Sequence, residues 1–289
     1  MFYALAIGSM LGSMLQNLLL VHHARKIDGL SLAFYRNVGF FFTLLPLLYG
    51  ASSQDITLVL GHWKLLTVSS VAGGVSLALA YASFRYIVVG VSTTINKAVL
   101  TIVMVILGWL LLDQPLAPSA LAFIALIILG SVLLGLERNA FPHLDNRHAL
   151  GLALSILSAL SIAFAFYALA VLATVADPLV SSYFWETSIA VACAVLIAIR
   201  WAAFGTVPQK ISWKTFCIIA ACSFPTLIGT GLFSLALRMG PIAIANAIGS
   251  GSLAVTALLA WGMYGEKLNL KQWMSIVLIL IGVIAMRFV

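Results

Sequence analysis

Charged residues are scarce in this 289-residue sequence, at 8% of the chain, whereas 63% of the residues are hydrophobic. A soluble domain carries about a quarter charged residues, so a chain with this little charge must turn most of its surface towards lipid. The net charge of +7 does not indicate a nucleic-acid partner. The basic residues stand singly between hydrophobic runs, which is how a membrane protein anchors its loops.

Cysteines and catalytic motifs are equally scarce. Cys193, Cys217 and Cys222 lie in apolar runs without the spacing of metal ligands or of a disulfide framework. The sequence has no His-Glu-x-x-His run, no nucleophile elbow and no phosphate-cradling glycine loop. We therefore expect no enzyme activity, no cofactor and no metal site. Without a nucleotide site, transport would have to be driven by a gradient.

Long apolar runs, by contrast, fill the chain. A transmembrane helix needs about 20 mainly apolar residues, and their continuous apolar character favours helices over a membrane β-barrel. The first run lacks a basic n-region, so we interpret it as a retained span and not as a signal peptide. Ten segments of this kind are present: 2–21, 30–50, 64–84, 89–112, 118–136, 149–173, 178–200, 213–236, 241–264 and 269–288.

The ten segments contain an internal repeat. The stretch 82–116 is repeated in the stretch 234–268, with Leu235 opposite Ala82 at a constant offset of 153. Arg85 corresponds to Arg238, and Asp113 corresponds to Glu266. Each copy thus has an arginine after one apolar helix and an acidic residue after the next, which marks the helix boundaries.

The first halves of the two sets also match, because Asp28-Gly-Leu corresponds to Asp177-Pro-Leu at an offset of 149. A polar linker over 137–148 separates the sets, so we expect two five-helix repeats, over 1–137 and 148–289. Five is odd, so the second repeat runs inverted. Inverted repeats are typical of transporters and place the binding site between them near mid-bilayer. The predicted fold class is an all-α integral membrane protein of ten transmembrane helices in two inverted five-helix repeats.

Lysines and arginines near the helix ends predict the orientation in the membrane. Three of them, Lys64, Arg238 and Arg287, lie on one face. Ten lie on the other, which this count places in the cytoplasm with both termini outside: Arg25, Lys26, Arg85, Arg138, Arg147, Arg200, Lys210, Lys214, Lys267 and Lys271.

The chain resembles EamA-type members of the drug/metabolite transporter superfamily. The resemblance is carried by Leu-Leu-Asp113, by Tyr-Gly-Glu266 and by the pattern Met-Gly-Pro-Ile-Ala, Trp-Gly-Met-Tyr-Gly-Glu-Lys-Leu and Ile-Gly-Val over 239–283. It implies a multi-pass transporter of the bacterial cytoplasmic (inner) membrane with both termini inside, opposite to the charge count. It does not select a substrate, because the superfamily moves amino acids, nucleosides, sugars, cations and drugs.

Three charged residues lie inside the predicted spans. A charge within lipid is costly, so it usually faces a cavity or a partner. We expect Lys97 to hold a carboxylate or phosphate, and Glu186 to hold an amine or to carry a coupling proton. The alternative is a structural ion pair that fixes helix packing. Arg36 either joins this site or extends to the membrane boundary.

Further candidates for the substrate site are polar or aromatic residues near these charges or on one stripe of the first helix. Ser9 and Ser13 share the stripe by their spacing of three and four, but Gly8 and Gly12 flank them, so we assign them to a helix contact. The candidates are Gln16, Asn17, Tyr81, Asn96, Trp185, Asn246 and Ser250. Trp185 and Glu186 are about 100° apart around their helix, so they do not both face the cavity centre squarely.

Two helices contain residues that weaken helical structure. Gly73 and Gly74 lie in the third predicted span, and Pro225 and Gly229 lie in the eighth, at nearly matching places in the two repeats. Proline removes a helical hydrogen bond and glycine eases bending, and interrupted helices at matching places indicate a transporter site. We assign these four residues to gating. Close packing at small residues is the alternative.

The sequence thus predicts a secondary transporter of a small polar metabolite, an amino acid or a related zwitterionic or anionic solute, that works by alternating access. The alternatives are a lipid-intermediate flippase and a non-transporting membrane scaffold. The expected partners are the small-molecule substrate, the lipid bilayer and a coupling proton, and the expected oligomeric state is a monomer or weak dimer.

Overall fold

The structure, a computed structural model, describes residues 1–24, 26–135, 146–264 and 268–288. Most of the predicted linker over 137–148 lies outside the described residues, as do Arg25, Arg138, Glu266 and Lys267. Within the described residues all regular structure is helical, and nine helical stretches are long and apolar enough to cross a membrane. The expected all-helical, multi-pass membrane class is confirmed.

The helices follow one another with short connections, in agreement with the apolar segments of the sequence. In chain order they are α1 (Phe2–Ala24), α2 (Gly29–Thr43), the 3₁₀ turn η1 (Leu45–Leu48), α3 (Ser53–Gly61), α4 (Trp63–Ser83), α5 (Val89–Leu111), α6 (Pro118–Gly135), α7 (Asn146–Val175), α8 (Pro178–Phe204), α9 (Trp213–Ser223), α10 (Thr226–Met239), α11 (Ile242–Ser250), α12 (Ser252–Tyr264), α13 (Leu270–Ala285) and η2 (Met286–Phe288).

Nine of the ten predicted segments coincide with these membrane-spanning candidates, and the second does not. Its α-helix, α2, has only 15 residues and ends at Thr43, and η1 continues it. Pro46 lies in the first turn of η1. Proline lacks the N–H that an α-helix needs at that place, which accounts for the change of helix type.

The short helix α3 was not expected from the sequence. It begins with a capping box, in which the Ser52 hydroxyl accepts from the Asp55 N–H at 3.1 Å and the Asp55 carboxylate accepts from the Ser52 N–H at 3.2 Å. The pattern Ser-x-x-Asp before an apolar run is a signature of a helix start. This short helix lies between the predicted spans 30–50 and 64–84, and its apolar run is too short to predict a further span.

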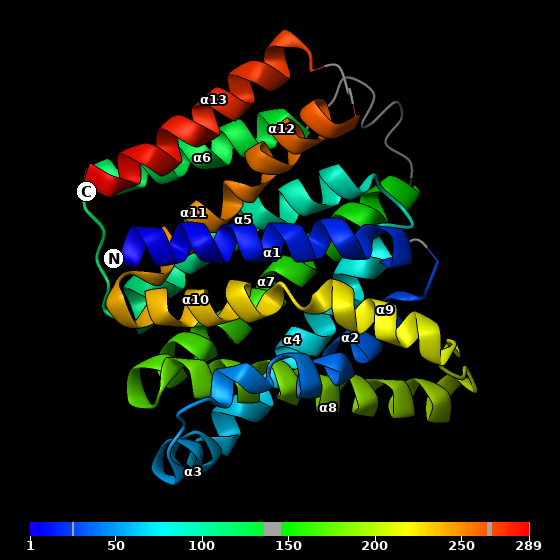
Figure 1. Ribbon diagram of the computed structural model, residues 1–289. Coiled ribbons are helices and arrows are strands. Elements are labelled where there is room, and N and C mark those ends of the chain that lie inside the picture. The colour runs from blue at the N-terminus through cyan, green and yellow to red at the C-terminus, as the bar shows by residue number, and fades with distance from the viewer. Residues whose placement is uncertain (25, 136–145, 265–267, 289) are drawn as a thin grey trace.

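The helices lie side by side, with α6 and α13 paired at one edge and α3 at the opposite edge (Figure 1). Both termini lie at the same end of the molecule (Figure 1). Glycine allows the close approach of α6 to α13, because a Cβ atom at Gly130 would meet the Ser275 carbonyl oxygen at 2.9 Å.

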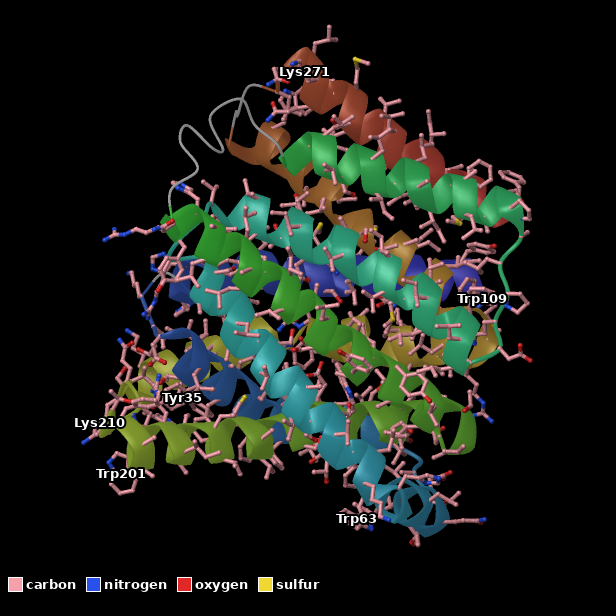
Figure 2. The ribbon with its side chains drawn as sticks, turned by 180° about the vertical axis from the view of Figure 1, so that it is seen from behind. Tyr35, Trp63, Trp109, Trp201, Lys210 and Lys271 are labelled. Carbon is pink, nitrogen blue, oxygen red and sulfur yellow. The ribbon has the colours of Figure 1, made fainter. Side chains whose placement is uncertain are left out.

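Exposed tryptophans lie at both ends of the helices (Figure 2). Trp63 and Trp109 lie at one end, and Trp201 lies at the other beside Lys210. Their exposed fractions are 60%, 64% and 60%. Tryptophan is enriched where a membrane meets water, so these residues indicate the two boundaries of the bilayer.

Only one of the two expected helix interruptions is present. Pro225 separates α9, which ends at Ser223, from α10, which begins at Thr226. The predicted interruption at Gly73 and Gly74 is absent, because α4 runs unbroken through both residues. A Cβ atom at Gly73 would meet Ile189 Cδ1 at 2.7 Å, so this glycine serves close packing of α4 on α8.

A close backbone approach joins α1 to α10. A Cβ atom at Gly12 would lie 2.6 Å from the backbone nitrogen of Gly229 and 2.9 Å from its Cα atom. This is the helix contact expected from Gly8 and Gly12. Backbone atoms cannot rotate away as a side chain can, so an added methyl group at Gly12 forces the two helices apart.

We predict that Gly12→Ala lowers the free energy of unfolding by about 1–3 kcal/mol, the usual cost of overpacking. Thermal unfolding of the purified protein in detergent measures it. The matched control is Gly90→Ala in α5, where a Cβ atom meets nothing within 4 Å and the gain in helix propensity is shared. Equal stability of the two variants would contradict the contact.

Candidate functional site

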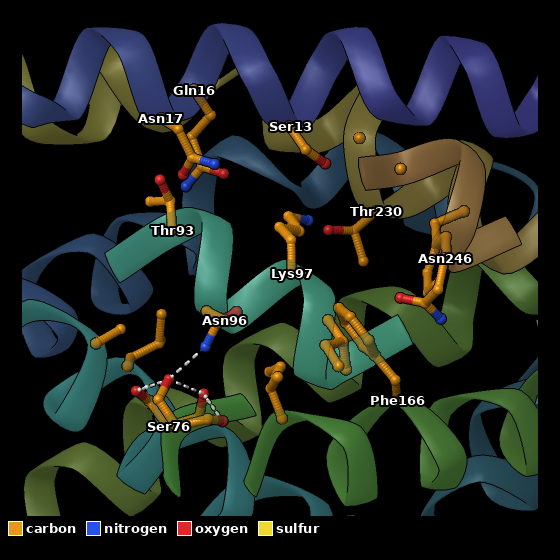
Figure 3. Close-up of a pocket in the computed structure, with 18 of the residues that line it drawn as sticks. Ser13, Gln16, Asn17, Ser76, Thr93, Asn96, Lys97, Phe166, Thr230 and Asn246 are labelled. Atoms are coloured by element: carbon orange, nitrogen blue, oxygen red, sulfur yellow. Dashed lines mark hydrogen bonds between the residues drawn. The ribbon is translucent and has the colours of Figure 1, made fainter. Parts of the chain in front are cut away.

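A cavity of about 280 Å³ lies in the interior of the helical assembly. Its walls come from α1, α2, α4, α5, α7, α8, α10 and α11. Figure 3 shows the polar stripe of α1 on one side and α4 and α7 on the other, with Lys97 of α5 between them. Residues from both predicted repeats therefore contribute to one space.

Lys97 lies in the middle of the cavity wall formed by α5 (Figure 3). Within the described part of the chain, its ammonium group makes no hydrogen bond and no salt bridge. Its carbonyl oxygen accepts from the Thr101 hydroxyl at 2.8 Å, which is a bond within the helix. A cation without a protein partner inside an apolar helix requires water or an anion.

Asn96 lines the cavity but uses its amide to join helices. Its Nδ2 donates to the Ser158 hydroxyl at 3.0 Å, and Ser158 in turn lies 3.0 Å from the Ser76 hydroxyl. Figure 3 shows this chain of bonds from α5 to α7 and α4. The bonds hold the first half of α5, and with it the start of the Lys97 side chain, in place.

Glu186 and Arg36 form the second charged part of the cavity. Glu186 is 3% exposed and accepts a hydrogen bond from the Thr230 hydroxyl at 2.8 Å. Arg36 lines the same cavity, and no salt bridge joins the two side chains. Arg36 is 8% exposed, and its guanidinium lies 4.7 Å from the centre of the Phe40 ring. It lines the cavity and does not extend to the membrane boundary.

The alternative of a structural Lys97–Glu186 ion pair is not realised. Neither side chain takes part in a salt bridge within the described residues. Both line the same cavity, Lys97 from α5 and Glu186 from α8, so the two opposite charges face a shared space without neutralising each other directly.

The polar stripe of α1 lines the cavity along its length. Gln16 is buried. Its side-chain oxygen accepts hydrogen bonds from Arg36 Nε and Nη2, and its side-chain nitrogen donates to the Thr226 hydroxyl at 2.8 Å. Asn17 is exposed towards the cavity mouth. Ser9 and Ser13, which we had assigned to a helix contact alone, line the cavity as well.

The aromatic candidates take different roles. Tyr81 and Trp185 both line the cavity. The Trp185 indole N–H donates to the Ala165 carbonyl oxygen at 3.1 Å and also contacts the Ser69 hydroxyl, so its polar atom serves packing. Its ring lies 5.6 Å from that of Phe166 and presents an apolar surface to the cavity.

Ser250 is the one candidate that does not line the cavity, whereas Asn246 and Gly249 on the same helix do. The Ser250 hydroxyl lies 3.1 Å from that of Thr101 on α5 and donates to the Asn246 carbonyl oxygen at 3.2 Å. One residue is a rotation of about 100° around a helix, which turns Ser250 away from the space that Gly249 faces.

Several lining residues were missed by the sequence analysis. Thr230 faces Glu186, and Phe166 and Phe233 pack together with ring centres 5.0 Å apart as an apolar wall. Nothing in the sequence distinguishes these aromatic residues from the many that face lipid. Thr230 had a weak signal, since it is a hydroxyl residue beside Gly229.

The cavity is open at one end and closed at the other. Asn17 is exposed, and Val89 and Thr93 are half-buried where α1 ends and α5 begins. At the opposite end Ala245 and Asn246 are buried. The open end is therefore the one that carries the α4–α5 connection, next to exposed Arg85.

Comparison with known proteins identifies the family. Residues 149–288 match the model of the EamA-like transporter family. The chain belongs to the drug/metabolite transporter superfamily. It is a multi-pass membrane transporter of this type, as the sequence resemblance predicted. The match covers the second predicted repeat, so the resemblance of the first repeat stays a prediction.

A solved structure shares the fold of the transporter. It is titled "Crystal structure of protein", and it aligns with a TM-score of 0.72 over 98% of this chain and 95% of its own, at 13% sequence identity. No curated protein matches the chain.

The four gating candidates of the transporter lie in different places. Gly229 lines the cavity, and Pro225 lies one helical turn before it at the break between α9 and α10. Gly73 and Gly74 lie outside the cavity lining, against α8. A further break, at Gly251 between α11 and α12, was not expected.

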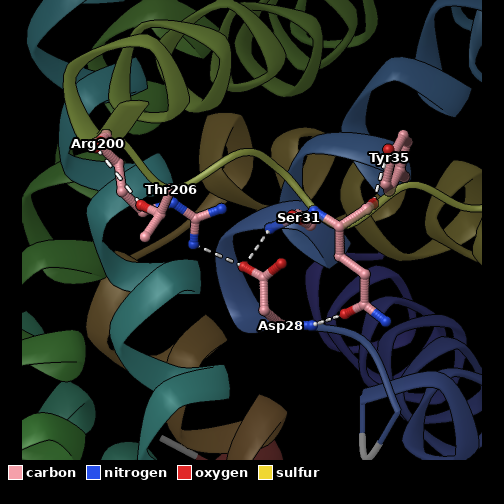
Figure 4. A network of polar contacts seen from close by, with 6 residues as sticks. Asp28, Ser31, Tyr35, Arg200 and Thr206 are labelled. Carbon is pink, nitrogen blue, oxygen red and sulfur yellow. Dashed lines mark hydrogen bonds and ion pairs between the residues drawn. The ribbon is translucent and has the colours of Figure 1, made fainter. Parts of the chain in front are cut away.

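A polar network joins α2 to the α8–α9 connection at the open end of the transporter (Figure 4). The Asp28 carboxylate accepts from Arg200 Nη1 at 2.9 Å and from the Ser31 N–H at 3.1 Å. The Gln209 side-chain oxygen accepts from the Asp28 N–H at 2.9 Å, and the Gln209 carbonyl oxygen accepts from the Tyr35 hydroxyl at 2.9 Å. The network ties the two predicted repeats together outside the cavity.

We predict that a cysteine at Thr93 reacts with a membrane-impermeant thiol reagent from the face that carries Arg85, and that a cysteine at Asn246 is protected. Serine replaces Cys217 and Cys222 in both variants, and buried Cys193 is retained. Mass spectrometry after one-sided labelling of vesicles measures the reaction. Faster labelling of the Asn246 variant from the opposite face would show that the cavity opens at the other end.

The Asp28 network predicts a pH dependence of stability. Burial alone would raise the pKa of the Asp28 carboxyl, but hydrogen bonds from Ser31 and Arg200 and the charge of Arg200 outweigh it and lower the pKa below its ordinary value of 3.8. A carboxyl of this kind stabilises the fold fully above the pKa of the unfolded chain. The stabilisation is lost as the pH falls through the lower pKa of the folded state.

Asp28→Asn should therefore lower stability by about 1 kcal/mol near neutral pH, and the difference from the wild type should vanish well below pH 3.8. Thermal unfolding in detergent across this pH range measures it. In a double-mutant cycle, the variant that combines Asp28→Asn with Arg200→Gln should lose no more stability than the less stable of the two single variants. Additive losses at neutral pH would mean that the pair does not interact.

Proposed function

We propose that this chain is a secondary transporter of a small polar metabolite, with amino acids and related zwitterionic or anionic solutes as the substrate class. The observation that carries the proposal is the placement of Lys97 and Glu186 in one cavity without a salt bridge between them. A zwitterion carries both complementary charges. Bound there, its carboxylate would pair with Lys97, and its ammonium group would pair with Glu186.

The size of the cavity supports a small substrate. Pockets for drug-sized ligands measure about 300–1,000 Å³, and this cavity of about 280 Å³ lies just below that range. Phe166 and Phe233 supply an apolar wall, and amide or hydroxyl groups of Asn17 and Ser13 supply polar contacts. A compact solute with charged and apolar parts fits this surface better than an acyl-chain lipid does.

Ten spans in two inverted repeats are the arrangement that we propose for transport. In it α2 and η1 together form the second span, and the repeats cover residues 1–137 and 148–289. The cavity then lies between the repeats, which is where inverted-repeat transporters bind substrate. Alternating access would close the end at Asn17 and open the end at Asn246, with the break at Pro225 as a place for movement.

The location that we propose is the bacterial cytoplasmic (inner) membrane. The face with more lysines and arginines carries the open end of the cavity, next to Arg85. By the distribution of basic residues this face is cytoplasmic, and the cavity as described would then accept solute from inside. The family resemblance assigns the opposite orientation, and one-sided labelling of Thr93→Cys in intact cells distinguishes the two.

We predict that Lys97→Ala reduces transport of labelled amino acids in proteoliposomes by more than tenfold, because a buried carboxylate left without its partner costs several kcal/mol. Lys97→Arg should retain part of the activity, because it keeps the charge. Lys64→Ala, which removes an exposed lysine outside the cavity, is the control. Size-exclusion profiles of the purified variants show whether each is folded.

A substrate is first found by screening the purified wild type against a metabolite library for thermal stabilisation, because a ligand of the folded state raises apparent stability. The same ligand should stabilise Lys97→Ala and Glu186→Gln much less. Equal transport by wild type and folded Lys97→Ala would exclude Lys97 as the anion-binding group.

A further inference from the structure

A second hollow lies on the outer surface of the protein, between α2 and the beginning of α9. We call it the α2–α9 groove. Phe34, Tyr35 and Val38 recur at helical spacing on one face of α2 and form one side. The groove is lined by Phe34, Tyr35, Val38, Ile211, Ser212, Trp213 and Phe216. It is open along its length and almost wholly apolar.

The groove begins at a polar boundary. The Tyr35 hydroxyl donates to the Gln209 carbonyl oxygen, which fixes the 209–212 segment across this end. The Ser212 hydroxyl caps α9 by accepting from the Thr215 N–H at 3.1 Å. Trp213 is 75% exposed and stacks on Phe216. An exposed tryptophan at a helix start is typical of the membrane–water interface, so the groove runs from the interface into the lipid.

The corresponding place on α8, in the second half of the chain, is already filled. At the offset of 149 that relates Asp28 to Asp177, Tyr35 corresponds to Phe184. Phe184 packs on a cluster to which α3 contributes Ile56 and Val59. The connection equivalent to α3 in the second half, residues 205–212, contains no helix. The protein therefore covers one copy of this face with its own helix and leaves the other uncovered.

The rim of the groove is positively charged. Lys210 and Lys214 are exposed and directly adjoin the lining residues Ile211 and Trp213. Figure 2 shows Lys210 at the same end of the molecule as Tyr35. The nearby acidic residue Asp28 belongs to the network in Figure 4, where its carboxylate pairs with Arg200 and accepts a hydrogen bond from the Ser31 N–H. In the part of the chain that the structure describes, no acidic side chain pairs with either lysine.

We propose that the α2–α9 groove is a binding site for an anionic phospholipid. One acyl chain lies along the groove, and the headgroup phosphate lies against Lys210 and Lys214. The apolar lining matches the acyl chain, and the bare lysines match the phosphate. A bound lipid here also covers the Tyr35–Gln209 contact and so strengthens the attachment of α9 to α2. The proposal does not depend on transport or on a particular solute.

The experiment titrates the delipidated protein in detergent with phosphatidylglycerol and with phosphatidylcholine of identical acyl chains. Native mass spectrometry counts retained lipids, and thermal unfolding reports stabilisation. We expect preferential retention of phosphatidylglycerol, by roughly fivefold for each lysine that contacts the headgroup. Lys210→Ala/Lys214→Ala should bring phosphatidylglycerol down to the level of phosphatidylcholine. Lys271→Ala, an exposed lysine of the same end on α13, is the charge control and should change nothing.

Val38→Trp fills the groove and should reduce retention of both lipids. Glycerol phosphate, which has the anionic group without an acyl chain, should not stabilise the protein. Equal retention of the two lipids by the wild type would overturn the headgroup assignment. Unchanged retention by a folded Val38→Trp variant would overturn the groove, and stabilisation by glycerol phosphate alone would identify a free-anion site. Loss of amino-acid transport in Lys97→Ala bears on neither result.

Discussion

The cost of a charge inside lipid governs the interior of this protein. Lys97, Glu186 and Arg36 lie within helices that are mainly apolar, and such residues require water, a partner or a ligand. Most buried hydroxyl groups form hydrogen bonds within their helix or to a neighbouring helix, as Ser76 does with Ser158, although the Ser131 hydroxyl and the Asn37 amide nitrogen have no partner within the described residues. The charges are thus concentrated around one cavity, while glycine contacts such as those of Gly12 and Gly130 close the remaining interfaces.

The two halves of the chain contribute unlike groups to this cavity. The cation comes from α5 in the first half, and the carboxylate comes from α8 in the second. Where Lys97 stands in the first copy, the second copy has Ser250, whose hydroxyl is turned towards Thr101. A solute that bridges the two charges would therefore contact both halves at once, whereas a solute with one charge would be held mainly by one.

The apolar segments predicted nine spans closely because long runs of lipid-facing residues leave little freedom in helix position. The second segment was less accurate because Pro46 ends its α-helix early. The interruption predicted at Gly73 and Gly74 is absent, because a glycine pair permits either a bend or a close helix contact. The sequence does not show which neighbouring helix packs there, and here it is α8. The charged candidates were placed in the cavity because a mid-membrane charge must face something polar. Phe166 and Phe233 were not predictable, because an aromatic residue is equally stable against lipid or against the bundle.

The contact of Gly12 with Gly229 has a consequence for movement. Because neither residue has a Cβ atom, the backbones of α1 and α10 lie in direct contact here, and a displacement of one helix would displace the other. Ser13, Gln16 and Asn17 on α1 and Thr230 on α10 therefore belong to one pair of contacting helices, whereas Glu186 belongs to α8. The hydrogen bond from Thr230 to Glu186 joins this helix pair to α8. Any displacement of the α1–α10 pair relative to α8 would lengthen this bond and leave the carboxylate free to bind a solute or a proton.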